Sequence, residues 1–213
     1  MLFSVFVVSA AVAGGQQSQY VPGEVMVKFQ VGSEASAALS QAILATPPNL
    51  ELLVPTTQLL TEKTGIPLRA KQILSGGWVL IAVDANALTQ RAITQLHKRD
   101  TVTGVEAKAG EPKGVGIPEM KDLAVSFLPG SPESGAIDDK LAGAQDGRFS
   151  ELVSDLAKTL DLPLQIKADK PAHLIIQIDL RELTALLSQR LKAVPAVIDS
   201  VQLNYIMTIM PTE

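Results

Sequence analysis

The sequence of 213 residues has no cysteine and two histidines. The absence of cysteine excludes disulfide bonds and thiol nucleophiles. A hydrolytic triad needs a histidine beside its nucleophile, but His97 lies at the basic end of an expected helix and His173 begins an expected strand. The sequence also has no glycine-rich phosphate loop, no Gly-x-Ser-x-Gly and no EF-hand spacing. We therefore expect a protein that is not an enzyme and holds no metal or cofactor.

The sequence has little excess charge and no long run of one sign. The net charge is −4 and the pI is about 5.3, which argues against a nucleic-acid partner. The apolar stretch over residues 2–13 is too short to span a bilayer as a helix. It ends in Ala11-Val12-Ala13, which is typical of a secretory signal peptide, although no Lys or Arg precedes it.

We therefore expect residues 1–19 to be a signal peptide and short spacer. Its removal would leave a secreted or periplasmic protein without a membrane span. The alternative is that this stretch is a buried element at the N-terminus.

An internal repeat is the main feature that the sequence does contain. Phe29 and Phe127 are 98 positions apart, as are Gly32 and Gly130, and each pair lies in a similar phrase. The offset stays between 95 and 98 for four further pairs of segments, which are 66–71 with 162–167, 78–84 with 173–179, 85–96 with 180–194, and 101–109 with 197–209.

The repeated segments predict the same secondary structure in both copies. Apolar residues alternate with polar ones in the strand-like segments, and recur every three or four positions in the helix-like ones. Asp84 and Asp179 stand where a carboxylate would cap a helix N-terminus. We expect Phe29 and Phe127 in the core, an extra helix over 33–46 in the first copy, and a polar loop around Asp138-Asp139.

The order of elements predicts an α+β fold with two tandem ferredoxin-like βαββαβ domains. Each domain would be a four-stranded antiparallel sheet with two helices on one face. A stretch rich in Pro and Gly separates the copies. We place domain 1 at residues 20–112, the linker at 113–121 and domain 2 at 122–213, and we expect each domain to have its own core.

Two phrases in the first copy resemble those of a known family. The segment "YVPGEVMVKF", residues 20–29, resembles the opening of many propeptides of subtilisin-like serine proteases. The segment "VEAKAGEP", residues 105–112, partly matches the Val-Glu-Tyr-Ala-Glu-Pro phrase that ends such propeptides, with one extra residue and no aromatic ring. The resemblance covers residues 20–112 directly, and reaches the second copy only through the repeat.

The resemblance implies a fold and a site. Propeptides of this family have a ferredoxin-like layout, help their protease to fold and then inhibit it. Their sheet packs on the protease, the tail after the last strand lies in the active-site cleft, and an acidic residue there caps protease helices. The candidate protease-binding residues stand at the ends of the two copies and are Lys108, Ala109, Glu111, Tyr205, Met207 and Met210.

The expected function is therefore binding of a subtilisin-like serine protease in trans, as an inhibitor or a folding chaperone. One alternative is a protein-interaction module that uses the same fold without inhibiting a protease. A further alternative is a small-molecule-sensing pair of ferredoxin-like domains.

Overall fold

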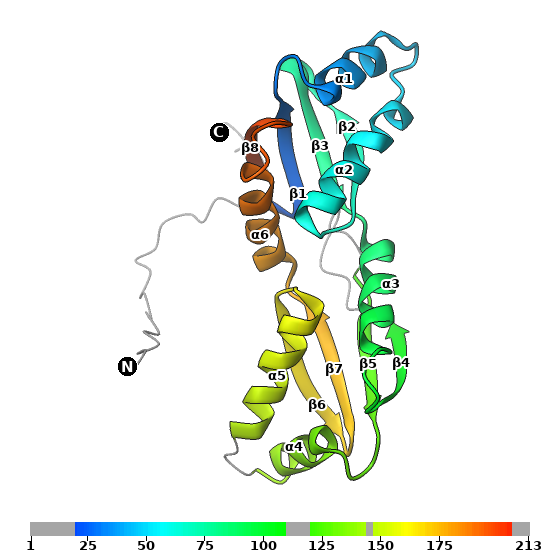
Figure 1. Ribbon diagram of the computed structural model, residues 1–213, viewed down its shortest axis with the longest axis vertical. Coiled ribbons are helices and arrows are strands. Elements are labelled where there is room, and N and C mark those ends of the chain that lie inside the picture. The colour runs from blue at the N-terminus through cyan, green and yellow to red at the C-terminus, as the bar shows by residue number, and fades with distance from the viewer. Residues whose placement is uncertain (1–19, 110–119, 144–146, 206–213) are drawn as a thin grey trace, which may run out of the picture.

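The computed structural model describes residues 20–109, 120–143 and 147–205. It shows an α+β protein with two four-stranded antiparallel sheets and six α-helices among these residues. Figure 1 shows the sheets at opposite ends of an elongated molecule, with helices packed against each of them. Residues 1–19, the predicted signal peptide and spacer, lie outside the described residues.

The expected elements are present in both copies. The first copy consists of β1 (Tyr20–Phe29), α1 (Glu34–Leu44), the short 3-10 helix η1 (Leu50–Leu53), α2 (Val54–Thr64), β2 (Leu68–Ile73), the 3-10 turn η2 (Ser75–Gly77), β3 (Trp78–Val83), α3 (Ala85–Leu96) and β4 (Val102–Lys108). The second consists of β5 (Asp122–Phe127), α4 (Pro132–Leu141), α5 (Gly147–Leu160), β6 (Leu164–Lys170), β7 (His173–Ile178), α6 (Leu180–Lys192) and β8 (Ile198–Tyr205).

The expected loop around Asp138-Asp139 is wrong, because both residues belong to α4. The helix begins like α1. Ser131 caps its N-terminus by accepting a hydrogen bond from the Ser134 N–H at 3.2 Å, as Ser33 does for α1. Among the apolar residues of α4 only Ala136 and Ile137 are buried, so its apolar face is too narrow to produce a clear helical pattern.

Both predicted aspartate caps are confirmed. The Asp84 carboxylate accepts a hydrogen bond from the Ala87 N–H at 3.0 Å, at the start of α3. The Asp179 carboxylate accepts from the first N–H groups of α6, at 2.9 and 3.1 Å. Each aspartate is the only residue between a strand and a helix, so the chain turns sharply at both places.

The sheets are not each built from one copy of the repeat. The strand order is β2-β3-β1-β8 in one sheet, which we call sheet A, and β4-β5-β7-β6 in the other, sheet B. The last strand of each copy therefore completes the sheet of the other copy. The helix before each of these last strands also joins the other copy. Helix α6 packs on β1 and β8, whereas α3 packs on β4 and α5.

This exchange also changes the core. We expected two separate cores, but the buried apolar side chains of both sheets form one cluster. The exchange begins at Asp84 and at Asp179, where the chain leaves one sheet and the following helix joins the other. Each copy would have its own core only if α3 and α6 packed on the sheet that contains the strand before them.

The predicted strand faces are confirmed. Phe29 and Phe127 are 4% and 2% exposed, and Val27 and Val125 are fully buried beside them. On β3 the residues Leu80 and Ala82 are also buried but lie outside the core cluster, because they point to the opposite face of sheet A. We call the face of each sheet that points away from the core its outer face.

We expect engineered disulfides to report the exchange. Met26 on β1 pairs with Gln202 on β8, and neighbouring antiparallel residues have Cα atoms about 4.5–5.5 Å apart, which suits a disulfide. Met26→Cys with Gln202→Cys should form an intramolecular disulfide on mild oxidation. The matched control is Met26→Cys with Glu106→Cys, because Glu106 holds the same place in the first copy; its cross-linking in the monomer instead would contradict the exchange.

We expect Phe127→Ala to lower the free energy of unfolding by about 3–5 kcal/mol, because it empties a closely packed part of the core. The neighbouring Leu128 is 51% exposed, so Leu128→Ala should change it by less than about 0.5 kcal/mol. Urea denaturation of the two variants measures both values. Equal losses would show that this part of β5 is not packed as described.

Candidate functional site

The outer face of sheet A has an apolar strip at its centre. Met26 pairs with Leu80 on β3, and the next pair on the same face is Lys28 with Trp78. Leu80 is buried, while Met26 and Trp78 are half-buried. Met and Trp are among the residue types that are enriched at protein–protein interfaces.

A buried carboxylate holds this face together. Glu24 on β1 is 2% exposed. It accepts hydrogen bonds from the Lys71 ammonium on β2 and from the Asn204 amide on β8, the latter at 2.7 Å. A buried charge is stable only with such partners, so Glu24 links both edge strands of sheet A to its centre. In sheet B the corresponding Asp122 accepts from the Gln177 amide at 2.8 Å.

The outer face of sheet B is more polar. Its strand pairs join Glu106 to Ala124, and Ser126 to His173. Lys167 lies opposite Ile175, and the Lys167 side chain is exposed. The two outer faces are thus chemically different, and the apolar strip belongs to sheet A.

The predicted protease-binding residues fall at two separate places. Tyr205 ends β8 in sheet A, is 52% exposed and pairs with Tyr20. Lys108 ends β4 in sheet B, and Ala109 follows it; both are exposed. Glu111, Met207 and Met210 lie outside the described residues. The exchange is the reason for this separation, because it gives the last strand of each copy to the other sheet.

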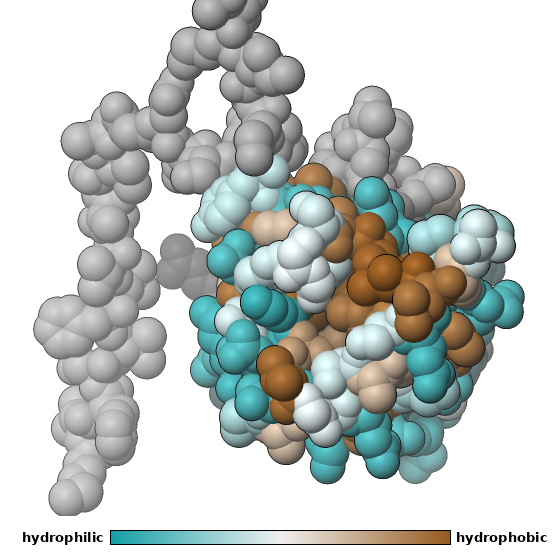
Figure 2. Space-filling view, turned by 90° about the horizontal axis from the view of Figure 1, so that it is seen from above, coloured by the Kyte–Doolittle hydropathy of each residue, from teal (hydrophilic) through white to brown (hydrophobic). Residues whose placement is uncertain are grey.

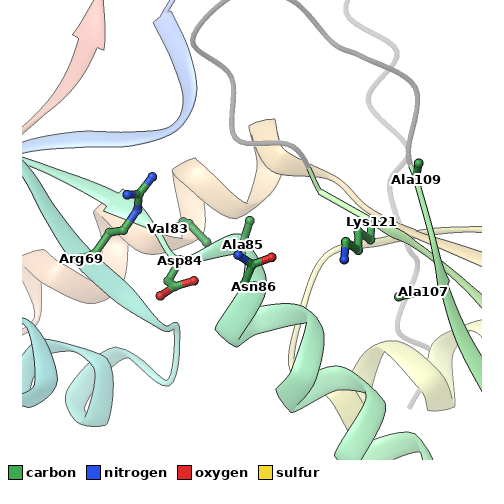
Figure 3. A pocket seen from close by; sticks show the side chains of 8 residues that line it. All are labelled: Arg69, Val83, Asp84, Ala85, Asn86, Ala107, Ala109 and Lys121. Atoms are coloured by element: carbon green, nitrogen blue, oxygen red, sulfur yellow. The ribbon is translucent and has the colours of Figure 1, made fainter.

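A cavity of about 580 Å³ lies where the first copy crosses from sheet A to sheet B. Its lining residues come from β2, the β3–α3 junction, the end of β4 and the residue before β5, and are Arg69, Val83, Asp84, Ala85, Asn86, Ala107, Ala109 and Lys121. Figure 3 shows Arg69 and Lys121 on opposite sides of the start of α3, with Lys121 directed toward Asn86. Of these residues the sequence named only Ala109 as a binding residue and Asp84 as a helix cap, because no motif contains the others.

An ionic cluster joins the first copy to the second. Arg99, after α3, contacts Asp155 on α5 at 2.6 Å and Glu133 on α4 at 3.3 Å. The Glu133 carboxylate also accepts a hydrogen bond from the Thr101 hydroxyl at 2.9 Å. This cluster fixes the segment between α3 and β4 against the helices of sheet B.

The cluster shifts two pKa values. Burial alone would raise the pKa of Glu133, but hydrogen bonds from its own backbone, Thr101 and Arg99, with the Arg99 charge, outweigh it and lower that pKa below its ordinary value. Burial would likewise lower the pKa of Arg99, but its bonds and charge interactions with Asp155 and Glu133 raise it. Both shifts favour the ionised pair in the folded protein.

We expect stability to fall at acidic pH through Glu133. Its pKa is lower in the folded protein, so its contribution is complete above the ordinary glutamate pKa and is lost as pH falls through the lowered value. Glu133→Gln should flatten the decline in the free energy of unfolding between about pH 5 and pH 3. Glu151→Gln, at an exposed acid on α5, is the matched control and should keep the wild-type slope. Identical slopes for all three proteins would exclude this role of Glu133.

An exposed apolar surface covers the end of the molecule formed by α1, η1 and the start of α2. Leu44 is 81% exposed, and Ile43, Leu52 and Val54 are 47%, 39% and 46% exposed. Figure 2 looks down on this end of the molecule and shows hydrophobic side chains gathered on one side of it. We call these four residues the α1 patch; exposed apolar groups of this kind are typical of contact surfaces.

The described parts of the chain contain no cluster of three or more His, Asp or Glu side chains that could hold a metal ion. None of the described helices combines the length and apolar character needed to cross a membrane. Compared with known proteins, the chain matches no family model, no curated protein and no solved structure.

Proposed function

We propose that the protein binds a subtilisin-like serine protease in trans, as an inhibitor or folding chaperone, and performs no catalysis itself. One observation carries the proposal. The segment that resembles subtilase propeptides, "YVPGEVMVKF", is strand β1, which lies between β3 and β8 in sheet A and contributes Met26 to its apolar strip. The protease would pack on this outer face.

The proposal includes a ferredoxin-like layout for each half of the molecule. Each sheet with its long helices would correspond to one βαββαβ unit whose final helix and strand come from the other copy. In that layout the tail that enters a protease cleft follows the last strand of the unit. For the unit that contains β1, this strand is β8.

The exchange favours one of the two groups of candidate residues within this proposal. Tyr205, with Met207 and Met210 after it, continues from the sheet that contains the propeptide-like strand. Lys108, Ala109 and Glu111 continue from sheet B, whose outer face is polar. We propose that the residues after β8 are the ones that enter the cleft, where an extended segment can pair through its backbone and place alternate side chains in pockets.

Export would bring the protein to the same compartment as a secreted protease. Residues 1–19 would then act as the signal peptide. Lys28, Met26 and Trp78 would lie in the interface, with the Trp and Met side chains supplying most of the buried apolar area.

The full chain should inhibit purified subtilisin, and charge in the apolar strip should weaken the inhibition. Met26→Lys places a charge where the protease would exclude water, so we expect the inhibition constant to rise at least about tenfold, equal to about 1.4 kcal/mol. Tyr205→Ala should also raise it, by a smaller factor. The matched control is Ala124→Lys, at the corresponding position of sheet B, which should inhibit like the wild type.

Three results would overturn the proposal or its site. A wild-type protein that neither inhibits subtilisin nor assists its refolding would reject the function. Loss of inhibition in Ala124→Lys but not in Met26→Lys would move the site to sheet B. Loss in Leu44→Ser alone would place the contact on the α1 patch, as expected of an interaction module that does not use the sheet.

A further inference from the structure

The chain crosses between the sheets at two equivalent junctions, and the cavity described above lies at the first of them. In the first copy the crossing is β3–Asp84–α3, and in the second it is β7–Asp179–α6. The repeat offset of 95 to 98 pairs each residue that lines the cavity with a residue at the second junction. Comparison of these pairs shows why the cavity exists.

The second junction carries larger side chains. Ala85 of the cavity corresponds to Leu180, Ala107 to Leu203 and Ala109 to Tyr205. Leu180 is 4% exposed, so it is packed. Ala85 and Ala107 therefore leave open at the first junction a space that corresponds to two leucines packed against the core at the second.

The second junction is also closed by hydrogen bonds. The Gln165 amide donates to the Asp179 carboxylate at 2.7 Å, and the Gly23 N–H donates to the Thr184 hydroxyl at 2.7 Å. The Tyr20 hydroxyl reaches the Arg181 carbonyl at 3.3 Å. These contacts satisfy the polar groups around the start of α6.

At the first junction two of these positions carry cations. Arg69 replaces Gln165, and Lys121 replaces Gly23. Both side chains are exposed, and neither has a hydrogen bond or an ion pair with any residue that the structure describes. The nearby Asp84 carboxylate is already used as the cap of α3. The lining thus has two cations without a partner among the described residues, the Asp84 carboxylate that caps α3, an amide from Asn86 and three alanines.

We propose that this cavity binds a small dicarboxylate. Arg69 comes from sheet A and Lys121 from the start of sheet B, on opposite sides of the start of α3 (Figure 3). A carboxylate at each end of the ligand would pair with one cation, and a short aliphatic middle would contact the alanines. The volume of about 580 Å³ lies within the range of small-molecule sites. The ligand bridges the two sheets, and this inference does not depend on protease binding.

Titration calorimetry of the full chain with succinate and glutarate tests the site. The dicarboxylates should bind and raise the melting temperature, because a ligand that binds only the folded state stabilises it. Arg69→Gln introduces the residue type that Gln165 has at the second junction. This variant and Lys121→Gln should each weaken binding about tenfold or more. Ala107→Leu introduces the residue type that Leu203 has at the second junction, and it should abolish binding by filling the cavity. Lys167→Gln, an exposed cation on β6, is the matched control and should bind as the wild type does.

Several outcomes would overturn the inference. Absence of binding to both dicarboxylates at millimolar concentration would reject the ligand class. Wild-type affinity in both Ala107→Leu and Arg69→Gln would show that the ligand binds elsewhere. Inorganic phosphate and the neutral succinamide are the remaining probes; equal binding of phosphate would show a general anion site, and equal binding of succinamide would show that the cations do not take part.

Discussion

Strand β1 forms backbone hydrogen bonds with β3 of its own copy along one edge and with β8 of the second copy along the opposite edge. The rest of the structure depends on this pairing. Because β8 lies at the far end of the repeat, sheet A is complete only when the second copy has been made. Sheet B depends in the same way on β4 from the first copy. The two copies therefore share one buried cluster, although the repeat in the sequence predicts two domains.

Ionic contacts hold the exchanged segments in place at both ends. Arg99 joins the α3–β4 segment to the helices of sheet B. Arg190 on α6 donates to the Thr64 carbonyl at the end of α2 at 2.7 Å, and contacts Asp161 at 2.8 Å. Arg99 thus pairs with helices of the unit that its segment joins, whereas Arg190 reaches the joined unit through the Thr64 carbonyl and forms its ion pair with Asp161 of its own copy.

The two copies share a backbone plan but have different surfaces. Sheet A has an apolar strip on its outer face and lies beside the exposed α1 patch, whereas sheet B has a more polar outer face. One crossing carries packed leucines, and the other has a cavity with two cations in its lining. Substitutions at a few exposed positions can change such surfaces without disturbing the core, so two copies with one backbone plan can differ in surface chemistry.

The sequence alone determined the local structure. Alternating apolar residues placed Phe29 and Phe127 in the core, and Asp84 and Asp179 were identified as helix caps, because both features depend on neighbours a few residues away. The pattern of α4 was too weak to identify, since only Ala136 and Ile137 of its apolar residues are buried.

Only the tertiary structure decided which sheet each last strand joins. Backbone hydrogen bonds form the sheet, and they are the same whether β8 pairs with β1 or with β5. The apolar residues Val201 and Leu203 alternate along β8 in a way that suits pairing with either β1 or β5. The cavity was hidden for the same reason, because Arg69, Ala107 and Lys121 are far apart in the chain and meet only when the exchange brings the two sheets together.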